Sequence, residues 1–138
     1  MFLADTNLLS EPRQKFPDAR VIEWLLAHEE ELFISAVSLA EIQSGISILA
    51  DGKKKIALQP WFDVLREKHH GAILDFNEAV ALRWGILDAD LSRRGKKMPL
   101  EDSYIAPTAL VYDLAIATRN ETDFAEAGVR IVNPWKEE

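Results

Sequence analysis

The stretch Phe2-Leu3-Ala4-Asp5-Thr6-Asn7 predicts a short buried strand that ends in a turn and leads into a helix. Its apolar part is too short for a helix, whereas Asp, Thr and Asn commonly leave strands and cap helices. Similar short apolar runs occur at residues 32–34, 72–74, 115–117 and 129–132. Helical patterns separate these runs, and such alternation indicates a parallel sheet wrapped by helices. We therefore expect an α/β fold, a three-layer sandwich whose central, mainly parallel sheet has about four to five strands.

Capping residues and apolar spacing place the helices. We expect helices after Asp18, from a capping box at Ser38-x-x-Glu41, over 60–68, after Asn77, over 100–112 and over 120–127. Gly52 is expected to close the second helix, and residues 53–55 to form a polar turn. We find no repeat, low-complexity tract or linker, so residues 1–138 are expected to form a single domain.

Composition narrows the classes of function. The chain has 138 residues, 48% of them hydrophobic, which is enough for one domain with its own core. Its net charge of −7 means that any polyanionic substrate needs a local basic patch or a metal ion. Cysteine is absent, which excludes disulfides, thiolate metal sites and cysteine nucleophiles. No apolar run reaches the roughly 18 residues of a membrane span, and we expect a cytoplasmic protein without a membrane partner.

Four acidic residues follow apolar runs or open predicted helices: Asp5, Glu41, Asp102 and Asp123. In open α/β sheets, residues beyond the carboxyl ends of the strands converge on one crevice, where ligands bind. Each acid also has a purely structural interpretation, as a helix cap, a capping-box member or a charge in a first helical turn. Together, however, they favour a shared site.

A cluster of carboxylates predicts a bound cation. Helix N-termini favour the charged form, so we expect a lowered pKa for these acids and ionisation near neutral pH. Oxygen ligands without Cys or paired His favour Mg²⁺ or Mn²⁺ over Zn²⁺. Such an ion generates hydroxide from water and stabilises charge on a phosphoryl group, so hydrolysis of a phosphodiester needs no histidine base.

Four motifs cover the length of the chain: Leu3-Ala4-Asp5-Thr6-Asn7, residues 35–42 (SAVSLAEI), Asp102-Ser103-Tyr104-Ile105-Ala106 and residues 117–124 (ATRNETDF). In order and spacing they resemble the PIN-domain family, and more closely the ribonuclease toxins of VapBC-type toxin–antitoxin pairs, including FitB-like members. The resemblance implies a metal-dependent endoribonuclease toxin that uses Mg²⁺ or Mn²⁺. It leaves open which RNA is cut and whether one or two ions bind.

The resemblance also assigns roles. It places Asp5, Glu41, Asp102 and Asp123 at the catalytic metal site, with Asp5 and Asp102 as the strongest candidates for direct ligands. Hydrogen bonds that orient these ligands are expected from Thr6, Asn7, Thr118 and Asn120. The family further implies an RNA substrate, a cognate antitoxin, a homodimer and a higher assembly with the antitoxin. Pro107 departs from the family pattern, in which alanine is more usual, and predicts a bend in the helix after Asp102.

Positive charge for RNA binding is expected from the basic run Arg93, Arg94, Lys96 and Lys97, from Arg119 and, less specifically, from Lys53, Lys54 and Lys55. Each run also fits an ordinary solvated surface. Trp61 and Phe62 are candidates for contact with an antitoxin.

Other functions remain open at this point. An aspartyl-phosphate phosphatase would use Asp5 as nucleophile, but the D-x-D pattern typical of such enzymes is broken by Asn7. A noncatalytic module is a further alternative, either a receiver-like phosphoacceptor or a degenerate PIN-like domain that only binds RNA or a partner.

Overall fold

The computed structural model describes residues 1–136. Within them, five strands form a single sheet in the order β3-β2-β1-β4-β5, and every neighbouring pair is parallel. The strands are β1 (Phe2–Ala4), β2 (Leu32–Ser35), β3 (Ile73–Leu74), β4 (Ala115–Ala117) and β5 (Ile131–Val132). The predicted parallel sheet is confirmed, with β1 at its centre.

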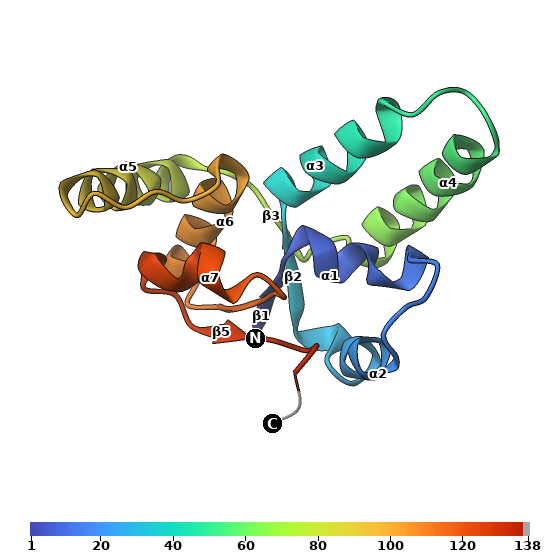
Figure 1. Ribbon diagram of the computed structural model, residues 1–138, viewed down its shortest axis with the longest axis horizontal. Helices are drawn as coiled ribbons and strands as arrows, with labels where there is room; N and C mark the ends of the chain where they lie inside the picture. Colours follow the sequence, from blue (N-terminus) through green and yellow to red (C-terminus); the bar gives the residue numbers. More distant parts are fainter. Residues whose placement is uncertain (137–138) are drawn as a thin grey trace.

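Helices connect the strands and cover both faces of the sheet (Figure 1). They are α1 (Thr6–Ser10), α2 (Ala19–Ala27), α3 (Ala36–Ser47), α4 (Lys53–Lys68), α5 (Glu78–Arg93), α6 (Leu100–Val111) and α7 (Glu121–Phe124). Short 3-10 helices are η1 (Glu11–Arg13), η2 (Glu29–Glu31) and η3 (Ala125–Ala127). Helices α1 to α4 pack on one face, and α5 to α7 on the other, which gives the expected three layers.

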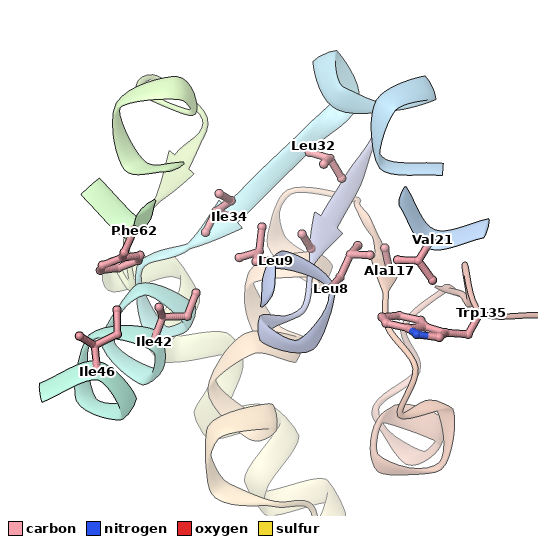
Figure 2. Packing of buried hydrophobic residues seen from close by; sticks show 11 residues of the cluster. Leu8, Leu9, Val21, Leu32, Ile34, Ile42, Ile46, Phe62, Ala117 and Trp135 are labelled. Atoms are coloured by element: carbon pink, nitrogen blue, oxygen red, sulfur yellow. The ribbon is translucent and has the colours of Figure 1, made fainter. Parts of the chain in front are cut away.

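Alternation along the strands divides the core in two, because successive side chains of a strand point to opposite faces. Ala4 and Ala117 belong to the cluster beneath α1 and α2, whereas Leu3 and Ile116 belong to the cluster beneath α5 and α6. In Figure 2, Phe62 of α4 faces the isoleucines of α3. The burial of Phe62 makes it unsuitable for the antitoxin contact suggested by sequence.

The predicted capping box at the start of α3 is wrong. Ser35, the last residue of β2, caps this helix by accepting a hydrogen bond from the backbone N–H of Val37 at 3.1 Å. Ser38 is therefore inside the helix and buried, and Glu41 lies in the second turn instead of the first. The strand and the helix follow each other without a loop, so the cap comes from the strand.

The boundary between α3 and α4 also differs from the prediction. Helix α3 ends at Ser47, and Gly52 precedes α4 instead of closing α3. The expected polar turn at residues 53–55 is the first turn of α4, and Pro60 lies inside this helix. Lys55 reaches back to the carbonyl oxygens of Ser47 and Leu49, at 3.4 and 3.3 Å, and so connects α4 to the end of α3.

Other sequence-based boundaries are confirmed. Asp18 and Asn77 cap α2 and α5 through their side chains. Helix α6 continues through the buried Pro107 without interruption to Val111. No helix in residues 1–136 is long and apolar enough to cross a membrane.

Candidate active site

Asp5 is held at the carboxyl end of the central strand. Its backbone N–H donates to the carbonyl oxygen of Ala117 at 3.0 Å, which continues the pairing of β1 with β4. One carboxylate oxygen accepts from the backbone N–H of Thr6 at 2.8 Å, at the start of α1. The other accepts from the hydroxyl of Thr118 at 2.8 Å. The side chain is thus fixed from two strands and is almost fully buried.

Thr118 connects Asp5 to the segment before α7. Its hydroxyl donates to Asp5 and accepts from the backbone N–H of Asn120 at 2.9 Å. Its own N–H donates to the carbonyl oxygen of Val132 at 3.0 Å, which fixes the end of β4 against β5. Thr118 has no exposed surface, so its hydroxyl has no access to water as an alternative partner.

Glu41 reaches the same site from the second turn of α3. The hydroxyl of Thr6 donates to Glu41 Oε1 at 2.9 Å, while the backbone N–H of Thr6 donates to Asp5. Thr6 therefore bridges two acids that are far apart in the sequence.

Asp102 and Asp123 lie in the first turns of α6 and α7. Unlike Asp5 and Glu41, their carboxylates receive no hydrogen bond from residues 1–136. They are half-buried. The charge of Asp123 acts on Asp5 and on Asp102, and Asp102 is also affected by the charges of Asp5, Glu41 and Glu101.

Burial and mutual repulsion raise the pKa of three of the acids. For Asp5 and Glu41, burial is the main cause, and hydrogen bonds from Thr118 to Asp5 and from Thr6 to Glu41 oppose it. For Asp102, burial and then the negative charges of Asp5, Asp123, Glu41 and Glu101 raise the pKa to about 7.

The expectation that helix N-termini keep all the acids ionised near neutral pH is therefore wrong. The loss of water around the carboxylates and the repulsion between them exceed the stabilisation by helix dipoles. In the metal-free protein, Asp102 is about half protonated near pH 7.

Comparison with known proteins gives a consistent result. The family described as "PIN domain" matches residues 2–129. The toxin FitB of Neisseria gonorrhoeae is 36% identical over 137 residues, covering 98% of this chain and 99% of that protein. The VapC ribonuclease Y4jK of Sinorhizobium fredii is 32% identical, covering 99% of both chains. The crystal structure of FitAcB from Neisseria gonorrhoeae superposes with a TM-score of 0.93 at 36% identity, covering 99% of this chain and 100% of that chain.

The chain belongs to the PIN-domain family. Within that family it belongs to the VapC/FitB toxins of toxin–antitoxin systems.

Glu101 also contributes negative charge to the acidic site of this PIN domain, although it is not among the four acids predicted from the sequence. It is exposed at the start of α6, and its charge contributes to the raised pKa of both Glu41 and Asp102. The signal available in the sequence was its position directly before Asp102.

The donor set of the PIN domain fits a hard divalent cation. All of its candidate ligands are carboxylates, without sulfur or imidazole, and burial together with mutual repulsion raises the pKa of Asp5, Glu41 and Asp102. A divalent cation would relieve this repulsion. Among residues 1–136, no three His, Asp or Glu side chains are already grouped so that they could hold a metal ion.

The basic residues suggested by sequence have different environments in the PIN domain. Arg94 is engaged with Asp90 at 3.0 Å and with Glu126 at 2.7 Å, and it also donates to the backbone carbonyl of Glu126. This network joins α5 to η3. Lys96 and Lys97 are exposed in the loop before α6.

Arg119 directly follows Thr118, and its guanidinium carbon lies 5.5 Å from the centre of the Trp135 ring. Of the expected orienting residues, Thr6 and Thr118 contact the acids through their side chains, whereas Asn120 contributes its backbone N–H. The side chain of Asn7 is exposed beside them.

Proposed function

We propose that this protein is a metal-dependent endoribonuclease, the toxin of a toxin–antitoxin pair, with Asp5, Glu41, Asp102 and Asp123 as its catalytic acids. The observation that carries the proposal is the convergence of the acids. Their charges interact although they come from separate segments of the chain. Burial and the neighbouring negative charges raise the pKa of Asp102 to about 7. The relative from Sinorhizobium fredii is itself described as a VapC ribonuclease.

The roles of the residues follow from their surroundings. Asp5 is oriented by Thr6 and Thr118, and Glu41 by Thr6, so both carboxylates are positioned before any ligand arrives. Within residues 1–136, Asp102 and Asp123 have no such partners, and their carboxylate oxygens are available to a cation. A bound Mg²⁺ or Mn²⁺ would activate water and stabilise charge on the scissile phosphate.

Cleavage of RNA by the purified protein tests this proposal. We expect cleavage of total RNA with Mg²⁺ or Mn²⁺, none with EDTA, and a loss of at least about 100-fold in Asp5→Asn and in Asp102→Asn. A matched control is Asp88→Asn on the exposed surface of α5, which should cleave as the wild type does. Full cleavage by Asp5→Asn would contradict the assignment of the site.

A noncatalytic PIN domain that only binds RNA gives a different result in the same experiment. It would bind RNA equally with and without metal and would cleave no transcript. Sequencing of RNA ends after brief expression of the wild type and of Asp5→Asn would also identify the target.

A cognate antitoxin is the second part of the proposal. An apolar groove of about 240 Å³ lies between α2 and α4, with Ile22, Leu25, Leu26 and Leu65 among its lining residues. We infer that a segment of the antitoxin occupies this groove. Leu26→Glu should cleave RNA normally but resist inhibition by the product of the adjacent gene, whereas unchanged inhibition would place the antitoxin elsewhere.

A homodimer is supported by the outer surface of α5, where Leu82 and Ile86 are both mostly exposed one helical turn apart. Light scattering would test it. We expect a dimeric mass for the wild type and a monomeric mass for Leu82→Glu combined with Ile86→Glu.

A further inference from the structure

A hollow of about 760 Å³ adjoins the acidic site. On the side of the acids it is lined by Asn7 and Asn120. Asn7 is two residues beyond Asp5, and the backbone N–H of Asn120 is bonded to Thr118, whose hydroxyl holds Asp5. A neighbouring hollow that is lined by Thr6 and Glu41 shares Gln14 and Lys15 with it, and this joins the hollow to the acidic site.

Aromatic rings and cations are paired on two sides of the hollow. Phe16, in the loop after η1, is 84% exposed, and the ammonium group of Lys15 lies 5.6 Å from its ring centre. On the other side, the Arg119 guanidinium lies over the ring of Trp135. The exposed ring of Phe16 therefore offers a flat apolar surface at the edge of a polar hollow.

Two acids and two cations line the hollow, and both acids are engaged within the protein. Glu11 accepts from the backbone N–H of Asp18 at 3.0 Å, and Asp18 forms an ion pair with Arg20 at 2.9 Å. Lys15 and Arg119, by contrast, form no ion pair with any residue in the range 1–136.

Amide side chains add donors and acceptors to this surface. Asn7, Gln14 and Asn120 line the hollow, and their side chains make no hydrogen bond within the described part of the chain. Amide groups pair with the polar edges of nucleobases.

We propose that this hollow binds an unpaired nucleotide of the RNA beside the scissile phosphate, with its base stacked on Phe16. Lys15 and Arg119 contact the flanking phosphates, and the free amides contact the base edge. An exposed aromatic ring next to cations suits single-stranded nucleic acid, since every base can stack and every phosphate carries charge. The proposal rests on the proposed function and adds to it a position for one base, on Phe16 beside the acids.

Binding measured without catalysis tests this proposal separately. A fluorescein-labelled single-stranded RNA of about 12 nucleotides is titrated with protein in EDTA, and its anisotropy is followed. We expect Phe16→Ala to weaken binding roughly 5- to 150-fold, the equivalent of one lost base stack. Phe16→Tyr should restore binding. The matched control is Ile48→Ala, because Ile48 is also 84% exposed but lies at the end of α3, outside the hollow.

Equal binding by Phe16→Ala and the wild type would overturn the proposal, as would equal affinity for the same RNA annealed into a duplex. The proposed function has a separate test: it would be contradicted if the wild type showed no metal-dependent cleavage. If cleavage occurs, Phe16→Ala should raise KM and leave kcat within about twofold. The reason is that stacking stabilises the bound substrate and the transition state equally.

Discussion

At the scale of single residues, Thr118 makes the connection on which the position of Asp5 depends. Its hydroxyl donates to one buried acid and accepts from the N–H of Asn120. Valine has nearly the same shape but can do neither. Thr118→Val should therefore reduce cleavage about 10- to 100-fold and destabilise the fold by about 1–3 kcal/mol.

Thr118→Ser is the control for this prediction, since it keeps the hydroxyl. Cleavage rates and urea denaturation of both variants provide the measurement. Equal activity of Thr118→Val and Thr118→Ser would show that the hydroxyl does not position Asp5.

Asp102 makes the stability of the metal-free protein depend on pH. Its pKa rises from 3.8 in the unfolded chain to about 7 in the fold. The folded state therefore binds this proton more tightly, so the contribution of Asp102 to stability is full below pH 3.8 and is lost as the pH rises toward 7. Asp102→Asn should be more stable than the wild type by about 1–2 kcal/mol at pH 8 after allowance for solvent screening.

Urea denaturation in EDTA at pH 5 and pH 8 measures this difference. We expect a smaller gain at pH 5, where the folded carboxyl of the wild type is mostly protonated. A variant that is less stable than the wild type at pH 8 would contradict the electrostatic account of Asp102.

At the scale of elements, α3 shows why the helix start matters for the site. A start at Ala36, with Ser35 as cap, places Glu41 in the second turn, where it meets Thr6 of α1. Ser35→Ala should cost about 1 kcal/mol, because it removes the bond to the N–H of Val37.

Ser38→Ala is the matched control, and it separates the observed cap from the predicted one. The buried hydroxyl of Ser38 has no hydrogen-bond partner within the described residues. Its removal should leave stability unchanged or slightly raised. Thermal denaturation of both variants measures the contrast, and a larger loss in Ser38→Ala would favour a capping box after all.

At the scale of the whole molecule, the parallel topology brings the acids together. Strands β1 and β4 are neighbours in the sheet although they are more than 100 residues apart, so Asp5 and Thr118 meet at the same edge. Helices α3, α6 and α7 then bring the remaining acids to that edge. The fold therefore concentrates negative charge in one place at a cost to its own stability.

A bound divalent cation should offset this loss of stability. Metal bound only by the folded state should stabilise the wild type by about 2.7 kcal/mol at a hundredfold excess over Kd. We expect the Tm to rise with Mg²⁺ or Mn²⁺, and the rise to be absent in Asp5→Asn and present in Asp88→Asn. An equal rise in all three proteins would indicate binding away from the acids.

The sequence by itself determined the strand and helix order and the parallel sheet, and it singled out four acids as candidates for one site. These follow from short-range information: apolar runs, their spacing, capping residues and motifs such as Leu3-Ala4-Asp5-Thr6-Asn7. The predicted start of α3 was wrong, because Ser35 and Ser38 are both good caps and only the length of β2 decides between them.

Only the tertiary structure decided the protonation of the acids, the engagement of Arg94 with Glu126, and the hollow beside Phe16. Each depends on distances between segments remote in sequence. Burial and repulsion act through space, so a helix-start argument gave the wrong direction for the pKa of Asp102. The sequence could name the acids of the site, but the charge that they carry depends on how closely the fold packs them together.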